Sequence, residues 1–304
     1  MKRISKITMI CLLLLGMLAV PVSAVLADDG DGNSGSINEK LGVPIAVFGE
    51  TLTDEQKEET RQMLRISGSD AVEEFTVTGQ DVSTYINGNP NARLFSSAKI
   101  TREESGKGLN INIVTPENIT EVTSEMYANA LLTAGVEDAT VDVASPVKVS
   151  GHSALTGIYK AYDVTGVELD KERMELANEE LDVATDLSKK EGLSQEKVSE
   201  LLTEIKKAIA EQKPATKEDV EKIIEEQLNK LEISLSEADR QMLTNLFEKM
   251  RDLDIDFGKV KDQLEDLTTT IKDKMDELGL DAGFWEKVQN FFKELFQKLA
   301  DLFK

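Results

Sequence analysis

The sequence predicts an α/β (α+β) N-terminal domain with a mixed sheet, followed by an all-α C-terminal helical region. Residues 41–165 mix short apolar or alternating runs of strand length with helical patterns, whereas residues 166–304 show helical patterns alone. Strand and helix signals that alternate along a chain are typical of layered domains. We therefore expect a signal peptide at 1–27, a flexible tether at 28–40, an α/β domain at 41–165 and a helical domain at 166–304.

The first 27 residues have the layout of a secretory signal peptide. Lys2, Arg3 and Lys6 precede an apolar run over 7–20, and small residues follow in PVSAVLADD. The run is short for a membrane span, which needs about 20 apolar residues. We expect cleavage near Ala27, with a retained signal anchor as the alternative. The protein would then be secreted or associated with the cell envelope.

Charge and cysteine content narrow the classes of partner. The chain has 35 basic and 57 acidic residues, a net charge of −22 that becomes −25 without the leader and its three basic residues. A surface this acidic repels phosphate backbones, so we expect no nucleic-acid partner. Cys11 is the only cysteine and lies in the leader. The mature chain would therefore contain no disulfide and no thiolate chemistry.

The first elements after the Gly, Ser, Asp and Asn-rich tether follow from local patterns. VPIAVFG is an apolar run of strand length, and Thr53 with Gln56 predicts a helix that begins with a capping box. Phe75 and Val77 alternate with polar residues as in a strand. DVSTYI is consistent with a helical turn, and NGNPN predicts a chain reversal. SSAKITREESGKGLNINIVT predicts a hairpin of strands near 97–103 and 108–114.

The next stretch predicts helix, strand and helix. A helical pattern near 119–134 ends at Gly135, and ATVDVASPVKVSG returns to the two-residue period of a strand. SGHSALTG then leads into an apolar run with helical spacing, where Ser150 or Ser153 would cap the helix. These elements together predict a mixed sheet covered by helices.

The region after residue 166 is predicted to be a series of amphipathic helices. Ser194, Thr216 and Ser236 each precede acidic residues and an apolar periodic run, which is the signature of a capped helix start. We expect helices near 168–190, 194–211, 216–231, 236–251, 257–278 and 283–303.

His152 is the only histidine, and its neighbour Ser153 suggests a nucleophile beside its base. GHSAL departs from the nucleophile-elbow pattern G-x-S-x-G, because Leu155 stands where the second glycine should be. We interpret the segment as a helix start, and a hydrolase that uses Ser153 and His152 remains the alternative.

No catalytic, cofactor-binding or metal site is predicted from motifs. One histidine without cysteine leaves only an oxygen-dominated set of metal ligands. Neither the phosphate-loop nor the dinucleotide-binding glycine motif occurs. Acidic residues are so numerous that no pair of the glycosidase type stands out. We therefore expect a protein that binds a partner rather than an enzyme.

The last predicted helix, 283–303, holds one continuous apolar stripe. From residue 284 onward it carries four lysines and three acids, a net charge of +1 in an acidic chain. The stripe either closes the core or docks on a membrane surface or a protein partner. This candidate partner or membrane face consists of Phe284, Trp285, Val288, Phe291, Phe292, Leu295, Phe296, Leu299 and Phe303.

Four stretches resemble the YpuA-like family of exported Gram-positive bacterial proteins of unknown function. They are LGVPIAVFGETLTDEQK, SSAKIT, VASPVKVSGHSALTGIYKAY and ISLSEADRQMLTNLFEKMRDLDIDFGKVKDQL. The resemblance implies a secreted or envelope-associated protein with an α/β domain and a helical region, and it brings no catalytic residue. We thus expect an exported, non-enzymatic binding or interaction protein. A hydrolase, or a membrane-surface-binding protein that acts through its C-terminal helix, is the alternative.

Overall fold

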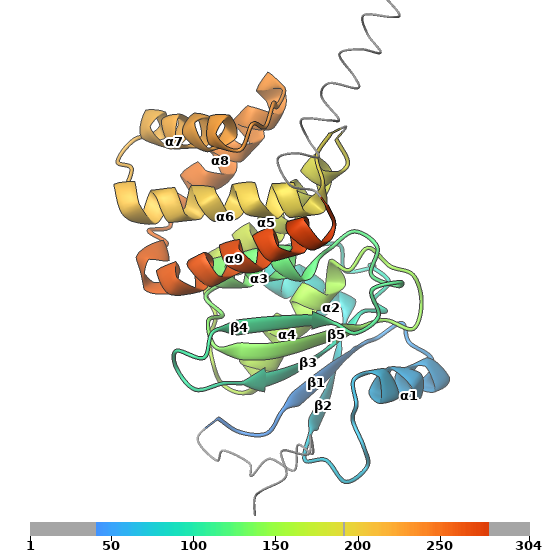
Figure 1. The fold of residues 1–304 in the computed structure, drawn as a ribbon. Coiled ribbons are helices and arrows are strands. Elements are labelled where there is room, and N and C mark those ends of the chain that lie inside the picture. The colour runs from blue at the N-terminus through green and yellow to red at the C-terminus, as the bar shows by residue number, and fades with distance from the viewer. Residues whose placement is uncertain (1–40, 191, 280–304) are drawn as a thin grey trace, which may run out of the picture. The chain divides into compact units, whose positions relative to one another are not determined.

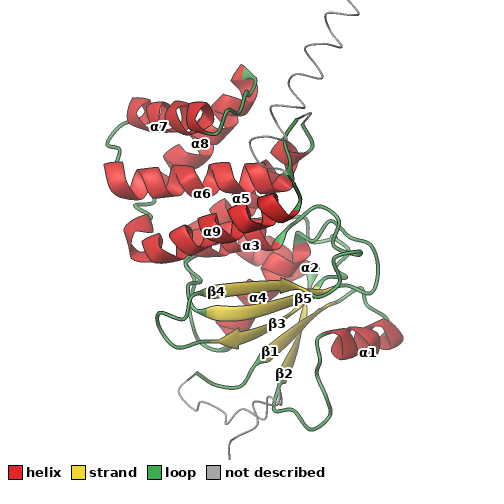
Figure 2. Ribbon diagram, in the orientation of Figure 1, coloured by secondary structure: helices red, strands yellow, loops and turns green. Residues whose placement is uncertain are grey.

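The predicted sheet and helices are present in the computed structural model, which describes residues 41–190 and 192–279 (Figures 1 and 2). All of these residues belong to one compact unit. A mixed five-stranded sheet with its helices comes first, and a run of helices follows. The predicted fold class is therefore confirmed. The predicted leader, tether and last helix lie outside the described residues.

The sheet has the strand order β2-β1-β3-β5-β4. β1 pairs in parallel with β2 and antiparallel with β3, while β5 pairs antiparallel with β3 and in parallel with β4. β2 and β4 are thus the edge strands. The strands are β1 (Ile45–Gly49), β2 (Glu73–Val77), β3 (Ser97–Arg102), β4 (Leu109–Ile113) and β5 (Ala139–Ala144).

The expected hairpin between the third and fourth strands is wrong. Both strands form, but β5 lies between them, so that Val141 pairs with Ile100 on one side and with Ile111 on the other. Helix α3 (Ser124–Ala134) supplies the crossover that a parallel β4–β5 pair requires. Burial favours this order, because β5 has buried residues along most of its length whereas β4 exposes two asparagines, which an edge strand tolerates.

Helices pack against one face of the sheet, while the opposite face holds a smaller buried cluster that includes Phe48 of β1. Helix α4 (Ser153–Val164) packs against β1 and β3, and its Leu155 and Ile158 join the large core. Helix α1 (Asp54–Met63) lies beside the opposite face, where Leu64 at its end packs with Phe48 (Figure 1). The predicted capping box of Thr53 and Gln56 is present at the start of α1. Helix α2 (Gly79–Ile86) packs against α4.

The helical region begins where the sequence signals indicate. Ser194, Thr216 and Ser236 are the N-caps of the second, third and fourth of its helices. None of the helices in the described ranges is long and apolar enough to cross a membrane. The elements are α5 (Lys171–Ser188), α6 (Gln195–Gln212), α7 (Lys217–Lys230), α8 (Glu237–Asp252), the 3₁₀ helix η1 (Phe257–Val260) and α9 (Lys261–Glu277).

Helix α3 joins the sheet to the helical region. It packs against β4 on one side and against α5, α6 and α9 on the other, so one apolar core includes Val47 of the sheet, Leu131 of α3 and Phe247 of α8. A division into two separately folding domains at residues 165 and 166 stays a prediction.

A buried ion pair lies at this junction. Lys206 Nζ of α6 is 2.6 Å from Glu180 Oε1 of α5, and the two side chains are 0% and 1% exposed. Lys206 also donates to the carbonyl of Asn129 at 2.7 Å, and the Thr133 hydroxyl donates to Glu180 Oε2 at 2.6 Å. Burial lowers the pKa of Lys206, and the charge of Glu180 opposes this effect.

Candidate functional site

The chain between β5 and α4 makes a sharp turn at Gly151. Its φ of +110° favours glycine, and the Tyr127 hydroxyl donates a hydrogen bond of 2.6 Å to its carbonyl. A Cβ at this position would lie 2.7 Å from Tyr127 Oη, so a larger residue would have to displace the tyrosine. The turn therefore fixes where Ser150 and His152 project.

His152 is the N-cap residue of α4, and no side chain caps this helix. Its Nδ1 lies 3.0 Å from Ser150 Oγ. Its Nε2 lies 3.3 Å from Thr185 Oγ1 and 3.4 Å from Asp182 Oδ1, both on α5. The expectation that Ser150 or Ser153 caps the helix is wrong, because His152 occupies the cap position and its imidazole contacts the Ser150 hydroxyl.

The neighbours of the imidazole determine its tautomer. The Thr185 hydroxyl donates its proton to the Asp182 carbonyl at 3.0 Å, so its oxygen acts as an acceptor toward His152 Nε2. Nε2 therefore carries the hydrogen, and Nδ1 accepts from the Ser150 hydroxyl. The Asp182 side chain is 56% exposed, yet partial desolvation raises the pKa of its carboxyl group and the nearby His152 opposes that shift.

Ser153, the neighbour predicted as a nucleophile, is placed differently. It is the first residue of α4 and, in the part of the chain that the structure describes, makes no hydrogen bond to His152. Ser150 holds the position that the hydrolase alternative gave to Ser153. The structure thus brings together Ser150, His152 and Asp182.

A cavity of about 340 Å³ lies over the start of α4, and we call it the α4 pocket. Its volume is within the range of small-ligand sites, which is roughly 300–1,000 Å³. The wall combines apolar side chains with serine, threonine and histidine side chains from several elements. It is lined by Val82, Ile86, Ala92, Arg93, Leu94, Phe95, Lys148, Val149, Ser150, Gly151, His152, Ser153, Thr156 and Asn178.

One hydroxyl in this wall has an unmet hydrogen-bonding capacity. Thr156 is fully buried, and its Oγ1 has no hydrogen-bond partner within residues 41–190 and 192–279. Buried polar groups in native proteins are nearly always paired. The wall of the α4 pocket therefore contains a buried hydroxyl whose hydrogen-bond partner the described residues do not supply.

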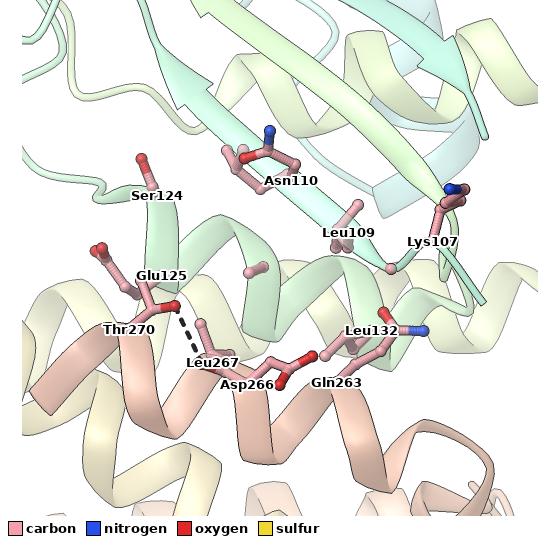
Figure 3. Close-up of a pocket in the computed structure, with 13 residues that line it drawn as sticks. Lys107, Leu109, Asn110, Ser124, Glu125, Leu132, Gln263, Asp266, Leu267 and Thr270 are labelled. Carbon is pink, nitrogen blue, oxygen red and sulfur yellow. Dashed lines mark hydrogen bonds between the residues drawn. The ribbon is translucent and has the colours of Figure 1, made fainter. Parts of the chain in front are cut away.

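A second cavity, of about 200 Å³, lies between β4, α3 and α9 (Figure 3). Figure 3 shows the side chains of Leu109, Leu132 and Leu267 between the strand and the helices, with carboxylates at the edge. Glu125 in this wall is already paired with Lys274 at 2.9 Å. The second cavity also holds a polar atom that is unpartnered among the described residues, Gln263 Oε1. The α4 pocket is larger and contains the histidine, so it is the stronger candidate site.

Metal ligands do not converge in the described part of the chain. No group of three or more His, Cys, Asp or Glu side chains in residues 41–190 and 192–279 is placed to hold a metal ion. The predicted partner or membrane face from Phe284 to Phe303 lies outside these ranges, and it stays a prediction.

Fold and pocket together define the class of this chain: an α/β protein with a helical extension and a pocket of small-ligand size. The chain belongs to the family described as "Protein of unknown function (DUF1002)", whose model matches residues 48–267. It is 33% identical over 297 residues to "Uncharacterized protein YpuA" of Bacillus subtilis (strain 168), an alignment that covers 95% of this chain and 98% of that protein. No solved structure matches the chain significantly. The resemblance to a YpuA-like family is thus confirmed.

The sequence alone did not reveal several of the pocket residues. Asp182 and Thr185 lie about one helical turn apart on α5, but nothing in their spacing shows that they face His152. Thr156 follows His152 by four residues, so helical periodicity places it one turn further along the same helix. That periodicity was the one signal that could have found it.

Proposed function

We propose that this protein is an exported, non-enzymatic binding protein that acts at the cell envelope or outside the cell, and that the α4 pocket is its ligand site. The leader-like N-terminus supports export. The observation that carries the binding proposal is the cavity of about 340 Å³, where an apolar wall meets converging polar groups.

The polar groups around His152 are held in place by the protein itself. Both ring nitrogens of His152 are occupied by protein partners, Ser150 on one side and Thr185 with Asp182 on the other. An imidazole that is held at both nitrogens is fixed in position, as a wall residue of a preformed site should be. The ligand would meet other polar groups of the wall, among them the unpartnered Thr156 hydroxyl.

Binding is tested with N-phenyl-1-naphthylamine, an uncharged fluorophore whose emission rises in apolar surroundings. Protein produced from the full chain should give saturable emission. Ile86→Glu places a carboxylate in the apolar wall and should weaken the affinity by about tenfold or more, because a charge in an apolar site is costly. Val164→Glu is the matched control, since Val164 is 37% exposed and does not line the pocket. Equal affinities of the wild type and Ile86→Glu would refute the assignment of the pocket.

Hydrolysis is the second candidate, because Ser150, His152 and Asp182 form one chain of contacts. A fluorophosphonate probe tests it: Ser150 Oγ would attack phosphorus, its proton would pass to His152 Nδ1, and fluoride would leave. Labelling of the wild type and of Ser153→Ala, but not of Ser150→Ala, would establish a nucleophile. Absence of labelling in the wild type would eliminate this candidate.

A further inference from the structure

The charged side chains that line the α4 pocket are opposite in sign to the net charge of the protein. Its lining includes two basic residues, Arg93 and Lys148, and no aspartate or glutamate, in a chain with 57 acidic and 35 basic residues. Neither cation has a carboxylate within ion-pair distance among the described residues, whereas most of the other lysines and arginines there are paired. Arg93 instead lies over the ring of Phe95, 5.4 Å from its centroid. Both cations are thus available to a negatively charged ligand.

The start of α4 adds to this positive field. α4 is a helix of 12 residues whose N-terminus receives no side-chain cap. The amides of Ala154 and Leu155 already donate to the carbonyls of Gly151 and His152, so the contribution of this helix end to an anion comes from the helix dipole. His152 and Ser153 at this end both line the pocket.

An independent observation indicates where a ligand oxygen is needed. Thr156, one turn into α4, is 0% exposed, lines the same cavity and has an Oγ1 without a partner in the described ranges. Its hydroxyl proton can be donated to an acceptor oxygen, and a carboxylate accepts from such donors more strongly than a neutral group. The unpartnered hydroxyl and the two unpaired cations would therefore all interact favourably with a negatively charged oxygen of a ligand.

The rest of the wall is apolar. Val82 and Ile86 of α2, with Leu94 and Phe95 from the loop before β3, form a surface that suits a hydrocarbon chain. A ligand that satisfies the whole pocket has an anionic end at the start of α4 and an apolar body against α2.

We propose that the α4 pocket binds an amphiphilic carboxylate, with its headgroup near Thr156, Arg93 and Lys148 and its alkyl chain against Val82 and Ile86. This inference rests on the proposed function, because it names the ligand class of the same pocket. The headgroup gains charge-assisted hydrogen bonds that an alcohol of equal chain length does not make.

The test is displacement of bound N-phenyl-1-naphthylamine from protein produced from the full chain, with decanoate, decanol and decyltrimethylammonium as competitors. Decanoate should displace the fluorophore at a concentration about tenfold lower than decanol, since a hydrogen bond to a charged group contributes about 1.5–3 kcal/mol. Decyltrimethylammonium should be the weakest competitor.

Variants separate the headgroup contribution from the alkyl contribution. Lys148→Gln should weaken decanoate by about fivefold and leave decanol unchanged, because only the anion pairs with the lysine charge. Thr156→Val should also weaken decanoate by about fivefold, and decanol by less, because the hydroxyl donates more strongly to a carboxylate than to a neutral oxygen. Lys222→Gln is the matched control, since Lys222 is 75% exposed on α7 and absent from the pocket. Circular dichroism and thermal melting of each variant verify that it is folded.

The outcomes distinguish the two proposals. Equal potency of decanoate and decanol would overturn the inference that the ligand is an anion, and so would a loss of binding of both competitors in Lys148→Gln. Neither result would contradict the assignment of the α4 pocket as a binding site. Failure of the fluorophore to bind the wild type would overturn the pocket and the ligand class together. A preference for decanoate of about tenfold that falls to about twofold in Lys148→Gln, shrinks in Thr156→Val and is retained in Lys222→Gln would establish the inference.

Discussion

The buried pair of Lys206 and Glu180 allows a sharp prediction, because it links the helical region to α3 and lies out of contact with solvent. The perturbation is Lys206→Met, which keeps most of the side-chain volume and removes the charge. The carboxylate of Glu180 then stays buried with the Thr133 hydroxyl as its remaining hydrogen-bond donor. The carbonyl of Asn129 loses its lysine donor as well.

The magnitude follows from the separation of 2.6 Å between the two charged atoms. With an effective dielectric constant of about 20, the attraction is about 6 kcal/mol, and it offsets a desolvation cost of several kcal/mol for each ion. Removing one partner leaves the desolvation cost of the other uncompensated. Lys206→Met should therefore lower the free energy of unfolding by about 3–5 kcal/mol.

The assay is urea unfolding followed by far-UV circular dichroism, with the dependence on urea compared between variants. The double variant Lys206→Met/Glu180→Leu should recover at least half of the lost stability, because it removes the stranded charge. Lys222→Met is the control, since its exposed pair with Glu226 contributes about 0–0.5 kcal/mol. A loss below about 1 kcal/mol in Lys206→Met, or a double variant no more stable than it, would refute the reasoning.

Three further predictions concern the turn, acid stability and the C-terminal segment. Gly151→Ala should lower the free energy of unfolding by about 2–4 kcal/mol, because Gly151 has a positive φ and an added Cβ would contact Tyr127. Gly157→Ala, inside α4, should raise the free energy of unfolding by about 0.5–1 kcal/mol, because an added Cβ there has its nearest contact at 3.7 Å. Urea titration measures both changes. Burial opposes ionisation of Glu204, but hydrogen bonds chiefly from Lys230 lower its pKa from 4.5 to about 2. The stability that this ionised carboxylate provides is complete above pH 4.5 and declines as the pH falls toward 2. Lys230→Met should therefore lower the free energy of unfolding by about 1–2 kcal/mol at pH 7. In acid-unfolding curves, the difference in stability between the wild type and Lys230→Met should shrink between pH 4.5 and pH 2. Liposome co-sedimentation should decrease when the chain ends at Gly283, if the predicted aromatic face binds membranes; equal sedimentation of both chains would reject that face.

Several elements were predictable because the information that specifies them is local. A capping box needs only residues three positions apart, so Thr53 and Gln56 marked the start of α1, and Ser194 and Thr216 marked later helices in the same way. The end of α3 was equally readable, because Gly135 adopts the left-handed conformation that terminates a helix.

The strand partners were not predictable in the same way. β3 and β4 are neighbours in the sequence and are separated by a glycine-bearing turn, which is the usual signature of a hairpin. Their separation by β5 depends on α3 packing across the sheet and on the burial of Val141 and Val143. Strand pairing is a competition between all the strands of a sheet, so local patterns do not decide it.

Some features of the candidate site were likewise predictable from local sequence, and others were not. The sequence by itself determined the acidic character of the chain, the mixed α/β and helical organisation, and the position of His152 at the start of a helix. Only the tertiary structure decided that Ser150 and Asp182 contact this histidine, and that Arg93, Lys148 and Thr156 share one cavity. The physical reason is that the first set depends on composition and on spacing within one helical turn. The second set depends on how α5 and α2 pack against α4, which the whole core determines at once.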